Sequence, residues 1–126
     1  SFVRYQEVGT GDRSAEFVPY HITYVPDGFL QTQNRLTESS FQEKYENEEG
    51  LIISFYQKRI EDAEFFIDTE NIESQEILLN EEQSASYMMY EEYLSIYWND
   101  DEYLFLVSGR INKNILVKIA ESVVKQ

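Results

Sequence analysis

The feature that most constrains the fold is a C-terminal hairpin whose second strand is apolar on both faces. Strand-like runs at 93–98 and 102–108 are joined by an acidic turn, 99–101, whose Asn and Asp residues suit a tight reversal. The residues of the second run alternate between two faces: Tyr103, Phe105 and Val107 on one, Leu104 and Leu106 on the other. A strand that is apolar on both faces is covered on both sides, so another element must lie over this sheet.

A helix at residues 112–125 is the candidate for that cover. Its apolar residues recur at helical spacing and form one stripe: Ile115, Leu116, Ile119, Ala120 and Val123. Asn112 is a suitable N-cap, and Lys118 and Lys125 suit the C-terminal half. We expect this to be the only long helix, with Ile115, Ile119 and Val123 buried against the sheet.

Most of the remaining sequence has the pattern of short strands separated by polar turns. The runs lie at 2–8, 17–25, 29–37, 40–45, 51–56, 64–68, 74–79 and 86–90. Turn residues at 26–28 and 47–50 separate several of them. The sequence therefore predicts an α+β fold, a curved antiparallel sheet (a meander of six or more strands) with a C-terminal helix packed on it. We expect one domain over residues 1–126.

The charge and composition exclude several classes of protein. The chain has 24 acidic and 10 basic residues, a net charge of -14, and no cysteine. Without cysteine there can be no disulfide, thiolate zinc site or cysteine nucleophile. Such an acidic chain should be repelled by nucleic acid and by anionic membrane surfaces. No apolar run approaches the ~20 residues that span a bilayer. Four of the bases lie after residue 109, where a basic helix complements an acidic sheet.

Catalytic motifs are missing from the sequence. His21 is the only histidine, and its strand context favours a structural role. No nucleophile elbow, phosphate-binding glycine loop or dinucleotide fingerprint is present. The carboxylates are too numerous for any pair to stand out as a glycosidase site, and none matches an EF-hand. We therefore predict a protein that is not an enzyme, with no catalytic residues, no cofactor and no metal site.

Aromatic residues form the remaining candidate for a functional surface. The chain has ten Tyr, eight Phe and one Trp. Five lie close in sequence and are candidates for a binding surface: Tyr87, Tyr90, Tyr93, Tyr97 and Trp98. Aromatic residues on strands usually form core and cross-strand pairs. Those left on an open face could instead bind a protein partner or a small apolar ligand.

Three motifs together resemble a known family. They are Tyr-Val-Pro-Asp-Gly-Phe at 24–29, Ile-Tyr-Trp at 96–98 followed by an acidic turn and Tyr103, and a closing helix at 115–123 with Ile-Ala-Glu-Ser at 119–122. In order and spacing they resemble the domain-of-unknown-function family numbered 4367, over about residues 20–125. Two departures are Asp100-Asp101, where the family usually has Asp-Gly, and the lack of a glycine near 80–84.

The resemblance implies an extracytoplasmic domain from a Gram-positive bacterium, often carried beyond a membrane-spanning helix and sometimes beside anti-sigma-factor-like segments. It implies no catalytic residues. The leading hypothesis is a non-catalytic sensor or interaction domain of a membrane-anchored or secreted envelope protein, attached to the membrane only through a segment outside this chain. The start at Ser1-Phe2-Val3, without a signal-peptide pattern, fits a piece of such a protein. The alternative is a carrier that binds a lipid or another apolar ligand on the concave aromatic face of the sheet.

Overall fold

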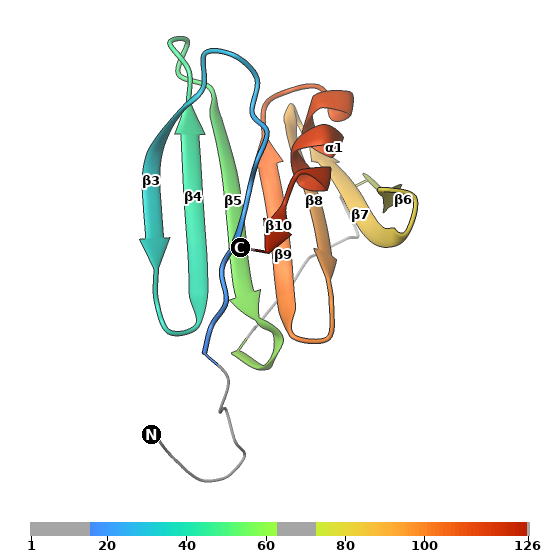
Figure 1. The fold of residues 1–126 in the computed structure, drawn as a ribbon. Coiled ribbons are helices and arrows are strands. Elements are labelled where there is room, and N and C mark those ends of the chain that lie inside the picture. The colour runs from blue at the N-terminus through green and yellow to red at the C-terminus, as the bar shows by residue number, and fades with distance from the viewer. Residues whose placement is uncertain (1–15, 63–72, 126) are drawn as a thin grey trace, which may run out of the picture.

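The computed structural model describes residues 16–62 and 73–125, most of which belong to one open antiparallel sheet (Figure 1). Its seven strands lie in the order β3-β4-β5-β9-β8-β7-β6. Their bounds are Leu30–Leu36 for β3, Ser40–Glu46 for β4, Ile52–Arg59 for β5, Glu73–Leu79 for β6, Gln83–Tyr90 for β7, Tyr93–Asn99 for β8 and Tyr103–Gly109 for β9. The predicted fold class, an antiparallel sheet of six or more strands with a C-terminal helix, is confirmed.

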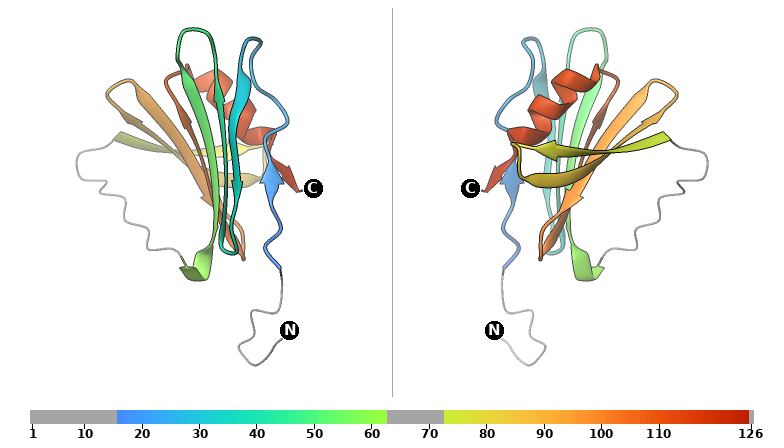
Figure 2. Two further views of the ribbon diagram at one scale, coloured as in Figure 1. Left: turned by 90° about the vertical axis from the view of Figure 1, so that its left-hand side faces the viewer. Right: turned by 90° about the vertical axis from the view of Figure 1, so that its right-hand side faces the viewer.

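The strand order departs from a continuous meander at one place. Strands β3–β5 and β6–β9 are two meanders, and the antiparallel pair β5–β9 joins them into one sheet. This places β9 in the centre of the sheet, a position that suits a strand with apolar residues on both faces. A short 3-10 helix, Ile60–Asp62, follows β5. The predicted strands at 2–8 and 64–68 lie outside the described residues. Figure 2 shows the strong twist of the sheet, with β6 and β7 turned across its end.

The turns form where the sequence predicts them, through short-range hydrogen bonds. The Asn47 side chain accepts from the backbone N–H groups of Glu49 and Leu51, at 3.0 and 2.9 Å. Asp100 likewise accepts from Glu102 and Tyr103, each at 2.7 Å. These Asx turns satisfy amides that the strand ladders leave free.

The core lies between one face of the sheet and helix α1, Lys113–Glu121, which packs on β8 and β9. We call this the helix face and the other side of the sheet the open face. Fully buried side chains fill the helix face: Ile53, Phe55, Ile96, Tyr103, Val107, Leu116 and Ile119. On the open face Leu104 and Leu106 are half-buried.

Helix α1 begins as predicted but ends early. The Asn112 side chain accepts from the Ile115 N–H at 2.9 Å, which confirms it as the N-cap. Ile119 is buried, with Leu116 and Ala120, whereas Ile115 and Val123 are only half-buried, contrary to our expectation. The helix stops at Glu121 because Val124–Lys125 forms strand β10, paired with strand β2, Tyr20–His21. Lys125 is therefore outside the helix.

Residues 16–25, which we call the strap, cross the helix face of the sheet and take little strand structure. The prediction of a strand at 17–25 holds only for Tyr20–His21. A segment lying on a sheet face cannot join the backbone ladder, so side chains of the sheet supply its hydrogen bonds. Gln57, which is fully buried, accepts from the Tyr20 N–H at 2.8 Å and donates to the Val18 carbonyl at 2.9 Å. Figure 1 shows the strap passing in front of β5.

Candidate functional site

Strand register divides the five predicted surface aromatics between the two faces of the sheet. Residues directly opposite each other in a ladder share a face. Tyr87 pairs with Ile96, so it lies on the helix face, as does Trp98 two residues beyond Ile96. Tyr90 pairs with Tyr93, and Tyr97 with Ser86, so these three tyrosines lie on the open face. The sequence-predicted set is therefore not one continuous surface.

Trp98 and Tyr87 belong to the packing of the helix face. Trp98 is 8% exposed and stacks on Phe105, with ring centroids 5.3 Å apart. Tyr87 is half-buried, and the Lys113 ammonium lies 4.7 Å from its ring centroid. This cation–π contact ties the start of α1 to β7. Tyr87 and Trp98 therefore contribute to the packing of the helix face. Tyr97 is half-buried and lies on the open face, in the middle of β8.

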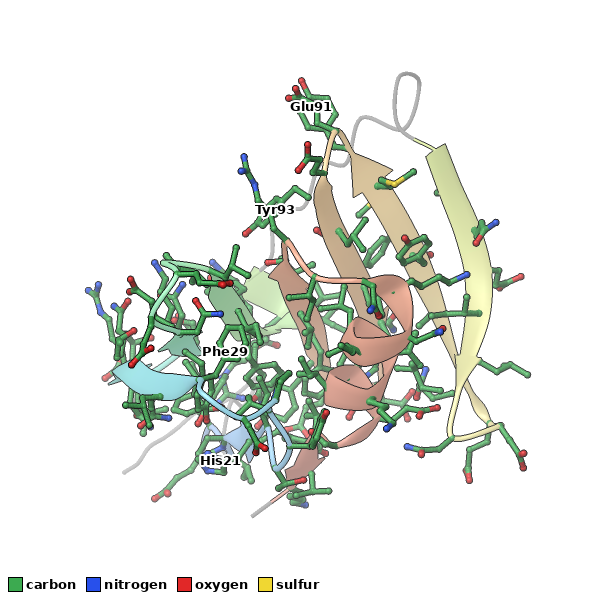
Figure 3. The ribbon with its side chains drawn as sticks, turned by 90° about the horizontal axis from the view of Figure 1, so that it is seen from above. His21, Phe29, Glu91 and Tyr93 are labelled. Carbon is green, nitrogen blue, oxygen red and sulfur yellow. The ribbon has the colours of Figure 1, made fainter. Side chains whose placement is uncertain are left out.

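Tyr90 and Tyr93 are the exposed members of the set. They are 59% and 42% exposed and stand as a cross-strand pair on either side of the two-residue β7–β8 turn. The Tyr93 hydroxyl lies 3.3 Å from the Ser108 hydroxyl on β9, which orients the ring. Figure 3 shows Glu91 and Tyr93 on the opposite side of the sheet from His21 and α1.

A shallow pocket of about 350 Å³ opens beside this pair, and we call it the hairpin pocket. Its lining consists of Tyr90, Glu91, Glu92, Tyr93 and Arg110. Leu94 pairs with Gly109 in the β8–β9 ladder, so Tyr93 and Arg110 are the next residues at its end. The five residues predicted from the sequence did not include the three charged residues, Glu91, Glu92 and Arg110. The register of the 93–108 hairpin was the signal that could have paired Arg110 with Tyr93.

The charged residues of the hairpin pocket have no partners within the part of the chain that the structure describes. Among residues 16–62 and 73–125, neither Glu91 nor Glu92 forms an ion pair with Arg110 within 4.0 Å, and none of the three side chains donates or accepts a hydrogen bond. Two negative charges and one positive charge thus stand around one hollow. A ligand entering it would meet all three.

A second polar cluster lies under the strap, centred on the Glu43 carboxylate. Glu43 is 2% exposed and accepts from the Ile22 N–H at 3.2 Å and from the Gln31 amide at 3.1 Å. His21 Nδ1 lies 3.4 Å from the same carboxylate, and the His21 ring meets Phe41 edge-on. Burial and the Glu43 carboxylate both raise the pKa of Tyr45.

This cluster is occupied by the chain itself. Donors from the strap and from neighbouring strands surround Glu43, so the cluster anchors the strap, in agreement with a structural role for His21. No group of three or more His, Asp or Glu residues within 16–62 and 73–125 is placed to hold a metal ion. In the same residues no helix has the length and apolar character needed to cross a membrane.

Fold and site together define a class: an α+β domain with an open antiparallel sheet, one face covered by a helix and a strap, the other carrying a small aromatic and charged pocket. The chain belongs to the family described as Domain of unknown function (DUF4367), whose model matches residues 19–123. This confirms the resemblance drawn from the three motifs. No curated protein and no solved structure matches the chain.

Proposed function

We propose that this chain is a non-catalytic sensor or interaction domain, exposed outside the cytoplasm on a membrane-anchored bacterial envelope protein, and that it binds through the hairpin pocket. The observation that carries the proposal is the exposed Tyr90–Tyr93 pair beside three charged side chains that have no partner among residues 16–62 and 73–125. Tyrosine offers a large amphipathic contact area at small entropic cost, which suits a recognition surface. The extracytoplasmic, Gram-positive setting and the anti-sigma-factor-like association rest on the family resemblance.

The acidic charge supports a partner other than nucleic acid. At -14, the chain has few cations with which to neutralise phosphates and release counterions. The proposal also holds that the domain needs no cofactor and contacts a membrane only through a segment outside this chain.

The carrier alternative finds less support in the helix face. Leu116 and Ile119 of α1 are fully buried there against Ile96 and Val107 of the sheet, so core side chains fill this part of the interface. A lipid would have to displace them, at the cost of the apolar burial that holds α1 in place.

Photo-crosslinking in intact cells tests the binding surface. A photoreactive residue replaces Tyr90 in the full parent protein, and a second variant carries it at Leu78, which has the same exposed fraction, 59%, and also lies on the open face. We expect an adduct that depends on position 90 and is absent from position 78. Equal adducts at both positions, or none at either, would contradict binding of a protein partner at the hairpin pocket.

The setting is tested separately. The proposal expects a membrane-spanning helix or lipid anchor in the parent before Ser1, and cleavage of this domain by protease added to intact cells from which the wall has been removed. Protection of the domain until the cells are lysed would contradict an extracytoplasmic location.

A further inference from the structure

The hairpin pocket holds opposite charges that do not neutralise each other. Glu91 and Glu92 form the β7–β8 turn, and Arg110 follows the last residue of β9. All three line the same hollow, and none is ion-paired within the described residues. A ligand that carries one charge of each sign could therefore contact both sides at once.

The backbone around the pocket is constrained on both sides. Gly109, the last residue of β9, lies so close to β5 that an added Cβ would be 3.0 Å from the Ile52 carbonyl oxygen. The backbone just before Arg110 is therefore tightly packed beside β5. Across the pocket, Glu91 has a φ of 56°, in the left-handed region of a tight turn. Strand pairing and a short turn thus set the backbone positions from which the charged side chains extend.

A pair of turn glutamates elsewhere in the chain shows that acidity alone does not make this site. Glu48 and Glu49 form the β4–β5 turn at the same end of the sheet. The residues that flank this pair are Asn47 and Gly50, where Tyr90 and Tyr93 flank the other. The hairpin pocket differs by its tyrosine pair and its arginine.

We propose that the hairpin pocket binds a small zwitterion, an α-amino acid with an apolar side chain. Arg110 would take the carboxylate, because guanidinium matches carboxylate geometry with two parallel hydrogen bonds. Glu91 and Glu92 would bind the ammonium group, which the tyrosine rings would also attract through cation–π interactions. The side chain would rest on Tyr90 and Tyr93. This inference rests on the proposed function and names the ligand of the same site.

Size and net charge favour such a ligand. A volume of about 350 Å³ is at the lower end of the roughly 300–1,000 Å³ typical of ligand pockets. A simple anion would be repelled by the net charge of -14, and a simple cation would leave the Arg110 guanidinium without an anionic partner. Since the pocket is open and its ligand small, we expect a dissociation constant on the order of 0.1–1 mM.

The test is titration of the isotope-labelled chain with L-leucine and L-phenylalanine, followed by backbone amide chemical shifts. Each amino acid is compared with its N-acetyl derivative, which lacks the ammonium, and with its amide, which lacks the carboxylate. We expect shifts at residues 90–93 and 110 with one or both free amino acids, and at least tenfold weaker binding of both derivatives.

Two variants and their matched controls assign the charges. Arg110→Gln should remove the preference for the free amino acid over its amide, and the double variant Glu91→Gln/Glu92→Gln should remove the preference over the N-acetyl form. The controls are Arg35→Gln on exposed β3 and Glu48→Gln/Glu49→Gln on the other turn, which should bind as the wild type does. The amide spectrum of each variant shows whether it is folded.

Three outcomes would overturn the inference: no binding of either amino acid, equal binding of the free and derivatised forms, or unchanged affinity in Arg110→Gln. None of these outcomes would contradict the proposed function, because crosslinking at position 90 detects a bound partner whatever its chemistry. Conversely, amino acid binding without a crosslinked partner would support a sensor of small molecules and leave no protein interaction at this surface.

Discussion

At the scale of single residues, backbone conformation shows where this chain departs from local preference. In the described part of the chain, the residues other than glycine with positive φ are Asn80, Glu81 and Glu91, at 53°, 66° and 56°. All three lie in the turns at the two ends of β7. Asparagine tolerates the left-handed region because its short side chain can hydrogen-bond locally, but glutamate has no such compensation for the steric cost. The hairpins therefore hold the two glutamates in a strained conformation.

Glu81→Gly should stabilise the protein by roughly 0.5–1 kcal/mol, because glycine adopts a φ of 66° without steric cost. The measurement is the free energy of unfolding in urea. Glu82→Gly is the matched control, since it removes the same charge from the same turn at a position without positive φ, and it should be neutral or destabilising. Equal effects of the two changes would show that charge, not strain, is responsible.

Two tyrosines link stability to high pH. Burial, and then the Asp100 carboxylate, raise the pKa of Tyr20 above its ordinary value of 10.0, and burial and Glu43 do the same for Tyr45. A raised pKa in the folded state means that the unfolded chain loses the proton first. The contribution is complete below about pH 10 and is lost as the pH rises through the folded-state values.

Urea unfolding at pH 8 and at about pH 11 should therefore show a loss of stability on the alkaline side. In Tyr45→Phe the loss should be smaller, because one of the two groups is gone. Tyr90→Phe, which removes an exposed tyrosine, is the control and should lose as much as the wild type. An equal loss in all three proteins would contradict the assignment to the half-buried tyrosines Tyr20 and Tyr45.

At the scale of elements, the strap shows how side chains can hold a segment that shares only a two-residue ladder with another strand. Four backbone N–H groups at alternate residues of the strap donate to side chains. The Val18 N–H donates to the Tyr103 hydroxyl at 2.9 Å, and the Tyr20 N–H to the Gln57 side-chain oxygen at 2.8 Å. The Ile22 N–H donates to the Glu43 carboxylate at 3.2 Å, and the Tyr24 N–H to the Ser122 hydroxyl at 3.1 Å. From Val18 to Ile22 the two-residue period is that of an extended chain whose alternate N–H groups face the sheet, and at the end of the strap the Thr23 N–H also donates to the Ser122 hydroxyl, at 3.1 Å. These four polar side chains hold the strap together with the short pairing of β2 with β10.

Gln57→Leu should destabilise the protein by roughly 2–4 kcal/mol, since it leaves the Tyr20 N–H and the Val18 carbonyl buried without partners. Hydrogen exchange should show loss of protection first at the strap amides. Gln42→Leu, a half-buried glutamine on β4, is the control and should leave the strap protected. Retained protection at Tyr20 in Gln57→Leu would contradict this account of the strap.

Helix α1 depends on the residues that face β8 and β9. Ile119 is fully buried, so Ile119→Asp would place an unpaired carboxylate in the core and should cost more than about 4 kcal/mol. Thermal unfolding should show a large fall in midpoint, or no folded state. Asn114→Asp, an exposed position in the first turn of the same helix, should change the midpoint little. A midpoint for Ile119→Asp within a few degrees of wild type would contradict the packing.

At the scale of the whole molecule, net charge opposes compactness. The chain carries -14, and its acids are distributed along the sequence before residue 110, while four of the ten bases lie after residue 109. Self-repulsion of this kind weakens the folded state, and salt screens it over about 10 Å at 0.1 M.

Raising NaCl from about 10 mM to about 200 mM should therefore raise the unfolding midpoint by a few degrees. Sucrose at matched osmolality should not reproduce the steep part of the rise at low concentration, because it does not screen charge. A midpoint that falls with salt would show that attractive ion pairs outweigh the repulsion.

The candidate site illustrates the limit of sequence reasoning about surfaces. The sequence identified Tyr90 and Tyr93 together with Tyr87, Tyr97 and Trp98, but it could not divide them between faces. That division depends on the β7–β8 register, with Tyr90 opposite Tyr93, and on the β8–β9 register, which brings Arg110 to the same end. Charged residues at a turn carry no local signal of what they will face.

Local chemistry in the sequence determined the strands from Leu30 to Gly109, the Asx turns, the Asn112 cap and the apolar stripe of α1, because alternation, turn residues and helical spacing act within a few neighbours. Only the tertiary structure decided the β5–β9 junction, the strap and the end of α1 at Glu121. Each of these depends on a pairing between distant residues, such as Val124 with His21 or Phe55 with Val107. The free energy of such pairings comes from burial and hydrogen bonds that exist only once the whole sheet has formed, so no short stretch of sequence specifies them.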